Sequence, residues 1–269
     1  YCLLDVSACA AGVIEALLTL LREAHTDIDD RLGKVIEEFL KTEFAAHNIS
    51  IVSGEYTACG EKGECDLVVE TPDTILFFEV KKKALTRKAR AGSDIDILID
   101  LAKSLLYAQL QAGRHEVRLR TLGYLDLEDD RGNINRIELS GRDIERIAVT
   151  FLDHGSFQDR MILQQFLATN LSALYTSADL GLQEKLDNLK IKLAEFRELY
   201  EKIASLDDRR RKNPFFHCWF LSLPQILILL DSVNSNEDLK DALWTTRYMS
   251  TGSLDFYYDY STAIKLRKG

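Results

Sequence analysis

Residues 66–81 read DLVVETPDTILFFEVK, and this stretch carries most of the information about the fold of the chain. Its two short apolar runs, LVV and ILFF, are rich in residues that favour β-strands. The TPDT segment between them has the composition of a turn. The pattern predicts a β-hairpin whose first strand carries an acid, Asp66, and whose second strand ends in Glu79-Val80-Lys81.

The two ends of this hairpin have the side chains of a metal-dependent hydrolytic site. Glu79 and Lys81 are two residues apart, so on a strand they share a face, while Val80 points into the apolar layer. A carboxylate at the end of a buried strand is costly without a partner, and a metal ion shared with Asp66 would be one. Hard cations such as Mg²⁺ take oxygen ligands, and a neighbouring lysine can orient water and offset phosphate charge. Two carboxylates and a lysine are a minimal set for phosphodiester hydrolysis.

The segments around the hairpin predict an α/β architecture. Residues 27–46 repeat apolar side chains at helical spacing, and an extended segment follows at 49–56. A second helix is predicted over residues 94–112, with Gly113 as its terminator. Further strands are predicted at 117–127, 134–139 and 147–152. This order of elements predicts a mixed sheet flanked by helices.

The order of acid, hairpin and acid-x-lysine resembles the PD-(D/E)XK nuclease superfamily over residues 31–152. Cys65 stands where many members have a proline before the first acid. The resemblance implies a restriction-endonuclease-like α/β fold in which Asp66, Glu79 and Lys81 are catalytic. It also implies a nuclease that depends on Mg²⁺ or Mn²⁺ and acts on nucleic acid, with DNA favoured over RNA.

Two further site positions follow from the resemblance. Members often have a glutamate on the preceding helix, for which Glu37 is the first choice and Glu38 the second. Many also place a polar residue on the helix after the lysine strand, which makes Gln109 a candidate and Gln111 a weaker one. The metal site implied in this way is formed by Asp66, Glu79, Val80 and Glu37.

A basic segment follows the hairpin directly. Residues 81–90 contain six basic side chains and no acid, although the whole chain has a formal net charge of −9. We expect this segment to contact phosphate, with a solvated loop as the alternative reading. The predicted nucleic-acid-binding residues are Lys83, Arg87, Lys88 and Arg90. A second basic run, residues 209–212, has the same two readings.

The chain divides into residues 1–156, the nuclease-like core with N-terminal helices, and residues 157–269, a helical region. Leu182, Leu186, Leu189, Leu193, Phe196, Tyr200 and Ile203 alternate spacings of four and three, the a/d pattern of a heptad helix. This seam requires a partner surface. Packing against the helix expected at 157–175 is favoured, with a homodimer through residues 182–203 as the alternative.

The composition, 46% apolar and 29% charged, is that of a soluble globular protein. The five cysteines form no C-x-x-C pair, which favours reduced thiols over a disulfide framework or zinc site. No apolar run is long enough to span a membrane, so a cytoplasmic location is expected. Two other functions stay open: a nucleic-acid-binding or protein-interaction module that keeps the fold without cleaving, and a scaffold built on the heptad helix.

Overall fold

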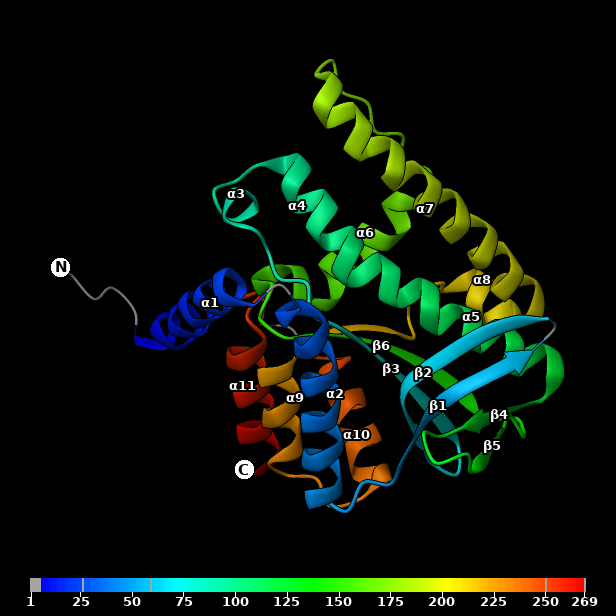
Figure 1. Ribbon diagram of the computed structural model, residues 1–269. Coiled ribbons are helices and arrows are strands. Elements are labelled where there is room, and N and C mark those ends of the chain that lie inside the picture. The colour runs from blue at the N-terminus through cyan, green and yellow to red at the C-terminus, as the bar shows by residue number, and fades with distance from the viewer. Residues whose placement is uncertain (1–5, 26, 59, 250, 269) are drawn as a thin grey trace.

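Seven strands form one sheet in the spatial order β5-β4-β1-β2-β3-β6-β7 (Figure 1). The structure is a computed structural model that describes residues 6–25, 27–58, 60–249 and 251–268. The strands β3, β6 and β7 run parallel to one another, and the other neighbouring strands are antiparallel. The strands are β1 (Ile51–Ala58), β2 (Glu61–Glu70), β3 (Thr74–Lys81), β4 (Tyr124–Glu128), β5 (Ile134–Glu138), β6 (Asp143–Thr150) and β7 (Cys218–Ser222).

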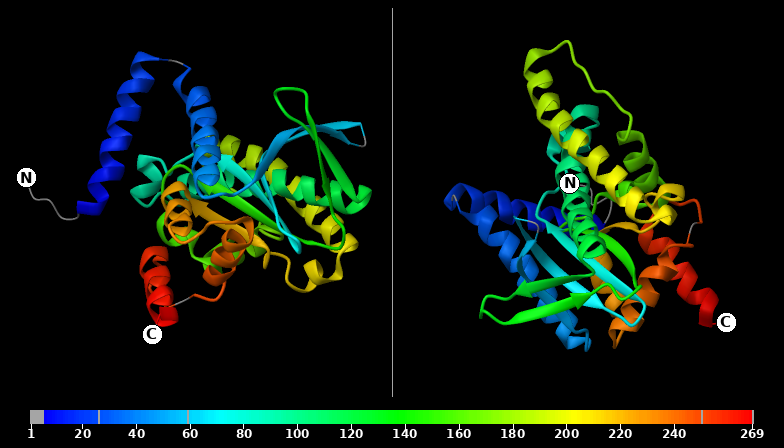
Figure 2. Two further views of the ribbon diagram at one scale, coloured as in Figure 1. Left: turned by 90° about the horizontal axis from the view of Figure 1, so that it is seen from below. Right: turned by 90° about the vertical axis from the view of Figure 1, so that its right-hand side faces the viewer.

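Helices cover both faces of the sheet (Figures 1 and 2). One face packs against α2 (Ile28–Ala46), α9 (Leu223–Leu230), α10 (Asn236–Thr246) and α11 (Phe256–Lys268). The other packs against α4 (Asp94–Leu101), the π-helical turn η1 (Ala102–Leu106), α5 (Tyr107–Leu122), α6 (Arg160–Asn170) and α7 (Leu180–Leu206). The remaining elements are α1 (Val6–Ala24), α3 (Arg87–Arg90), η2 (Gly155–Gln158) and α8 (Asp208–Lys212). The predicted α/β class, with a mixed sheet and flanking helices, is confirmed.

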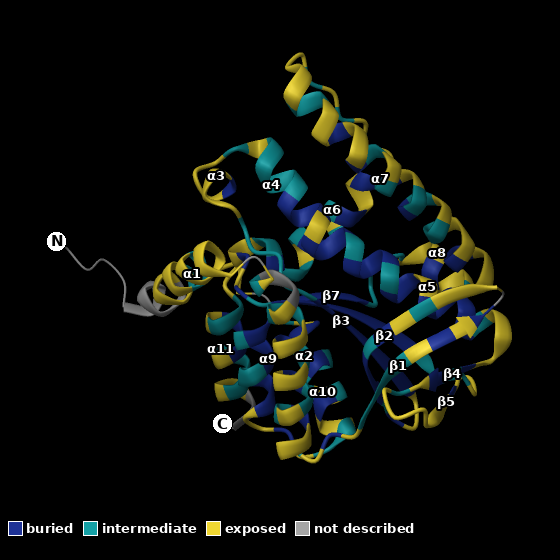
Figure 3. Ribbon diagram, viewed as in Figure 1, coloured by how far each residue is buried: buried dark blue, intermediate teal, exposed yellow. Residues whose placement is uncertain are grey.

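The hairpin predicted from residues 66–81 forms as β2 and β3. The two strands pair antiparallel from Leu67↔Phe78 to Glu70↔Ile75. Both faces of the hairpin are buried: Phe78 packs edge-on against Phe44 of α2, with ring centroids 5.4 Å apart, while Phe77 faces the α5 side. Burial on both faces explains why its apolar runs are continuous rather than alternating. The central strands are accordingly the most buried part of the molecule (Figure 3).

The helix after the basic segment is longer than the sequence predicted. The prediction of a helix end at Gly113 and a strand over residues 117–127 is wrong, because α5 continues to Leu122 and β4 begins at Tyr124. Gly123, with a left-handed φ of 83°, terminates the helix.

Gly113 does not end the helix but lies inside it, and the apolar pattern of residues 117–121 explains why a strand was predicted there. A Cβ at Gly113 would lie 2.7 Å from the Leu199 side chain, so the glycine lets α7 approach α5 closely. Because α5 is buried between the sheet and α7, its apolar residues do not repeat along one face. Residues 117–121, VRLRT, therefore alternate as a strand would.

The region after residue 156 is largely helical, as predicted, but it also completes the sheet. β7 pairs with β6 from Arg146↔Cys218 to Thr150↔Ser222. Ser222 then forms a capping box with Gln225 at the start of α9. Since β7 and α9 share a hydrophobic core with α2, residues 1–156 and 157–269 are not separately packed units.

The heptad seam of α7 is buried within the chain. Leu186, Leu189, Leu193 and Phe196 belong to a core with α4, η1, α5 and α6. The main neighbour of α7 is α5, a partner that the sequence did not reveal, and α6 from the predicted 157–175 region contributes to the same core. The buried part of the seam is not a free surface for the predicted homodimer. Among the described residues, no helix has the length and apolar character needed to cross a membrane.

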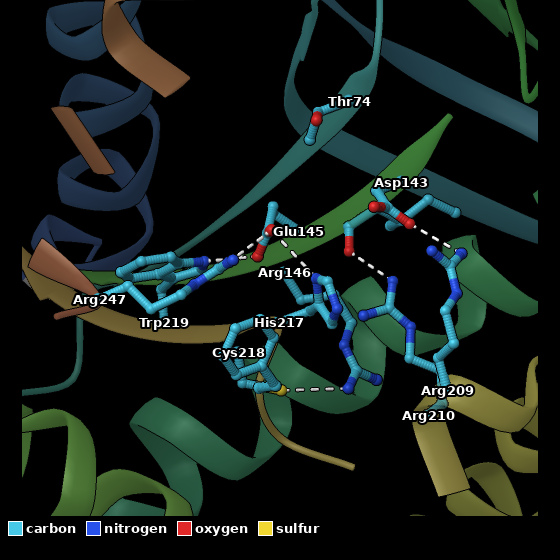
Figure 4. A network of polar contacts seen from close by, with 12 residues as sticks. Thr74, Asp143, Glu145, Arg146, Arg209, Arg210, His217, Cys218, Trp219 and Arg247 are labelled. Atoms are coloured by element: carbon cyan, nitrogen blue, oxygen red, sulfur yellow. Dashed lines mark hydrogen bonds and ion pairs between the residues drawn. The ribbon is translucent and has the colours of Figure 1, made fainter. Parts of the chain in front are cut away.

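Charged side chains on both faces of β6 link the two halves of the chain (Figure 4). Arg210 of the second basic run is 1% exposed; it donates to the carboxylate of Glu116 on α5 at 3.0 Å and to the backbone oxygen of Ile144 at 2.7 Å. On β6, Glu145 accepts hydrogen bonds from Arg247 and from the Trp219 indole, at 2.6 and 2.8 Å. Arg210 is therefore a buried structural cation rather than a solvated loop residue or a phosphate contact.

Candidate functional site

The candidate site lies where β2 separates from β3. β2 pairs with β3 only from Leu67 onward, whereas its pairing with β1 extends from Glu61 to Val69, with a register shift between Val52 and Gly54 of β1. The β1–β2 hairpin thus projects away from the central strands, as Figure 2 shows. One residue beyond the last pair, the Asp66 carboxylate accepts a hydrogen bond from the Val80 backbone N–H at 2.7 Å. This contact holds Asp66 beside the strand that carries Glu79 and Lys81.

Glu79 is 1% exposed and lies at the centre of this site. One carboxylate oxygen, Oε2, is 3.5 Å from the Lys81 ammonium. The other, Oε1, is 2.9 Å from Nε2 of His115, which comes from α5. The shared face of Glu79 and Lys81 predicted from their spacing is therefore observed, and α5 supplies a partner of its own.

The His115 side chain is positioned by a chain of hydrogen bonds. Its Nδ1 lies 2.6 Å from the Tyr56 hydroxyl, which accepts from Arg118 at 2.8 Å. Because an arginine only donates hydrogen bonds, the Tyr56 hydroxyl is free to donate its own hydrogen to Nδ1 of His115. Nδ1 is then the acceptor of the neutral ring, and Nε2–H donates to Glu79. A Cβ at Gly63 would lie 2.3 Å from the Tyr56 ring, so this glycine, three residues before Asp66, makes room for the ring.

Gln109 is not brought to the site. Its Nε2 donates to the backbone oxygens of Arg146 and Trp219, both at 3.2 Å, so it bridges β6 and β7. The polar residue from this helix that reaches Glu79 is His115, which sequence reasoning missed because it has no metal-ligand spacing to other histidines. The predicted helix ended at Gly113, so the sequence did not place His115 on the same helix as Gln109.

The environment of Asp66 strongly disfavours its charge. Burial is the largest cause, the neighbouring Glu79 adds to it, and together they raise the pKa of Asp66 to about 8. The Lys81 ammonium and the Val80 N–H offset only part of this effect. A cation beside Asp66 and Glu79 would remove the repulsion between them.

Glu37 faces the same region from α2. Together with Asp66 it lines a cleft of about 560 Å³, and burial raises the pKa of Glu37. Glu38 is exposed and pairs with Lys41 at 2.9 Å. Acids outnumber bases among the described residues that line the cleft: the acids are Glu37, Glu38, Glu55, Glu64, Asp66, Asp129 and Asp130, and the bases are Lys34, Lys41 and Arg131. The cleft is therefore better suited to a cation than to an unaccompanied phosphate.

The carboxylates near the cleft are ligands of the kind that a hard divalent cation takes. Within the described residues, no group of three or more His, Cys, Asp or Glu side chains is close enough to hold a metal. Phosphate-handling Mg²⁺ sites, however, use one or two carboxylates and complete the shell with water and substrate. Asp66 lines the cleft, whereas Glu79 is 1% exposed and does not line it, so these two carboxylates are candidate ligands that are not both open to the cleft. The Val80 side chain is buried in the apolar core, and its N–H is bonded to Asp66.

The predicted phosphate-contacting residues differ in how far they are neutralised. The Lys83 ammonium is 2.8 Å from the carboxylate of Asp100, and Arg90 forms an ion pair with Glu15 of α1. Arg87 and Lys88 are exposed on α3. The segment is thus partly held by acids rather than freely solvated.

In comparisons with protein-family models, with curated proteins and with solved structures, no match to the chain was found.

Proposed function

We propose that this chain is a divalent-metal-dependent nuclease that hydrolyses phosphodiester bonds in nucleic acid, with DNA as the expected polymer. The observation that supports the proposal most is the meeting of Asp66, Glu79 and Lys81 at the divergence of β2 from β3. Asp66 is bonded to the backbone of the strand that carries Glu79 and Lys81, and the charges of both side chains act on its carboxylate.

Each residue has a distinct task in the proposed reaction. Asp66 and Glu79, with Glu37 across the cleft, would hold Mg²⁺ or Mn²⁺, which supplies polarisation of the phosphodiester and compensates its developing charge. Lys81 orients the attacking water and offsets phosphate charge. His115 holds the Glu79 carboxylate in place from the opposite side.

The assay is cleavage of single- and double-stranded DNA and RNA in the presence of Mg²⁺, Mn²⁺ or EDTA. Lys81→Ala should lower the rate by about 10²- to 10⁴-fold, the usual contribution of a group that assists proton transfer. Lys62→Ala, which removes an exposed lysine from the far end of β2, should cleave like the parent. Equal cleavage by the parent and Lys81→Ala would show that the active site is wrongly assigned.

Metal binding provides a second measurement that does not depend on turnover. Mg²⁺ should raise the melting temperature of the parent and of Lys81→Ala, because a ligand that binds only the folded state stabilises it. Asp66→Ala should lose this increase.

A non-cleaving nucleic-acid-binding module that keeps this architecture is the second candidate. It is favoured by one observation: both Glu79 oxygens already have partners, His115 and Lys81, without a metal. A parent protein that binds nucleic acid yet cleaves none of the four polymers with either metal would establish this candidate instead.

A further inference from the structure

A second, basic pocket lies beside the candidate site. It has a volume of about 450 Å³ and is enclosed by α1, the segment after β3, α3, η1 and the end of β6. Six of its lining residues are basic: Arg22, Lys82, Lys83, Arg87, Arg90 and Lys103. Among the lining residues that the structure describes, the acid is Glu15. In a chain with net charge −9, this is a marked local concentration of positive charge.

The pocket is pre-organised by buried contacts. Asp100, 3% exposed, holds Lys83 at 2.8 Å and accepts the Thr86 backbone N–H at 2.6 Å, which anchors the segment after β3. Arg87 and Lys103 are exposed, and within the described part of the chain neither has an ion-pair partner. Their charges are therefore available to a ligand, while the walls of the pocket are already in place.

The pocket begins one residue beyond the candidate catalytic lysine. Lys81 pairs with Thr150 in the parallel β3–β6 ladder, and the next residues, Lys82 and Phe151, line the pocket. A group held there is adjacent to the point where the proposed hydrolysis takes place. Sites outside the carboxyl ends of parallel strands are common binding positions in α/β proteins.

From this geometry we propose that the basic pocket binds the terminal phosphate monoester of a nucleic-acid strand. A terminal phosphate carries about −1.5 to −2 charges at pH 7, against a single charge for an internal phosphodiester, so it profits more from several clustered cations. The volume lies within the range of about 300–1,000 Å³ typical of small-ligand pockets, which suits one terminal nucleotide rather than a duplex. Resting on the proposed nuclease function, the pocket directs cleavage to bonds next to a strand end.

The test measures binding in EDTA, where cleavage is excluded. Three single-stranded oligonucleotides of one sequence carry a 5′-phosphate, a 3′-phosphate or no terminal phosphate, and fluorescence anisotropy gives their affinities. We expect one phosphorylated strand to bind about tenfold more tightly than the unphosphorylated strand, as charge-assisted hydrogen bonds typically allow. Arg87→Gln and Lys103→Gln should each reduce this ratio towards one.

Lys88→Gln is the matched control, because Lys88 is exposed on the same short helix as Arg87 but does not line the pocket. It should weaken all three strands alike and preserve the ratio. Competition by a nucleoside monophosphate as strong as that by the phosphorylated strand would assign the pocket to free nucleotides and overturn the strand-end proposal. Equal affinities of the parent for all three strands would overturn it as well.

Cleavage of a circular single-stranded DNA, scored separately, distinguishes the two proposals. A parent that cleaves circles and shows no phosphate preference keeps the nuclease function and loses the strand-end pocket. A parent with the preference but without cleavage of any linear substrate keeps the pocket and loses the nuclease function.

Discussion

Asp66 shows how a single side chain can be disfavoured in the folded state and still be useful. Its carboxylate is drawn to the Val80 N–H, yet burial and Glu79 raise its pKa to about 8. A folded acid with a raised pKa takes up a proton that the unfolded chain releases at its ordinary pKa of 3.8. The metal-free protein is therefore penalised increasingly as the pH rises between these two values.

Removing this acid should stabilise the metal-free protein in a pH-dependent way. At pH 8, Asp66→Asn should be more stable than the parent by on the order of 1–3 kcal/mol. The difference should shrink as the pH falls and vanish only below about pH 3, where the unfolded parent is protonated as well. Urea denaturation in EDTA at pH 4, 6 and 8 measures it. Asp231→Asn, which removes an exposed acid and changes the net charge equally, is the control. A difference that grows towards low pH instead would contradict the assigned pKa direction.

At the scale of elements, α7 shows how a heptad pattern can serve an internal core. Leu189 is 4% exposed and packs with residues of α5 and α6, whereas Ile191 on the same helix is 59% exposed. Gly113 allows this contact by leaving space for Leu199. The a/d pattern indicates that a partner surface exists, and here other helices of the same chain form that surface.

A charge placed on the seam distinguishes packing from dimerisation. Leu189→Asp should lower the free energy of unfolding by more than about 3 kcal/mol, because it puts an unpaired carboxylate into the core. Ile191→Asp should change it by less than about 0.5 kcal/mol, as is usual at exposed sites. Chemical denaturation and light scattering together give the answer. If the parent is a dimer and the Leu189→Asp variant is a folded monomer, the seam is an interface between two copies of the chain.

At the scale of the whole molecule, buried charges connect segments that are far apart in sequence. Burial acts to raise the pKa of Glu116, but the guanidinium groups of Arg210, Arg146 and Arg120 outweigh it and lower the pKa. Arg210 comes from the C-terminal half, and it also bonds the backbone of β6. The helix α5, the sheet and α8 are thereby joined through one carboxylate.

Neutralising that carboxylate should affect the whole fold. Glu116→Gln removes a carboxylate from the buried Arg146 and Arg210 and from the half-buried Arg120, and Asp207 remains as a partner of Arg120 and Arg210 only. We therefore expect a loss of about 3–5 kcal/mol in the free energy of unfolding. Glu195→Gln, which breaks a partly exposed pair with Arg114, should cost less than about 1 kcal/mol. Urea unfolding of both variants makes the comparison. Similar losses in the two proteins would mean that the buried cluster adds no more than a surface pair.

The sequence alone determined the features that depend on short-range pattern. The hairpin of residues 66–81 follows from strand propensity and turn composition, and the common face of Glu79 and Lys81 follows from the two-residue period of a strand. The capping box at Ser222 is equally local. The order of these elements was enough to predict a mixed sheet between helices, because few layer arrangements bury such patterns.

Only the tertiary structure decided which distant side chains meet. His115 reaches Glu79, while Gln109 on the same helix bridges β6 and β7, because α5 is buried on several sides and its rotation is set by packing. Because α5 is buried on several sides, its apolar residues do not follow one helical face, and the pattern did not show where the helix ends. β7, which comes from the C-terminal half, joins the sheet by pairing in parallel with β6 across some seventy residues of intervening chain. No local sequence rule encodes such long-range contacts, since they depend on how whole surfaces fit together.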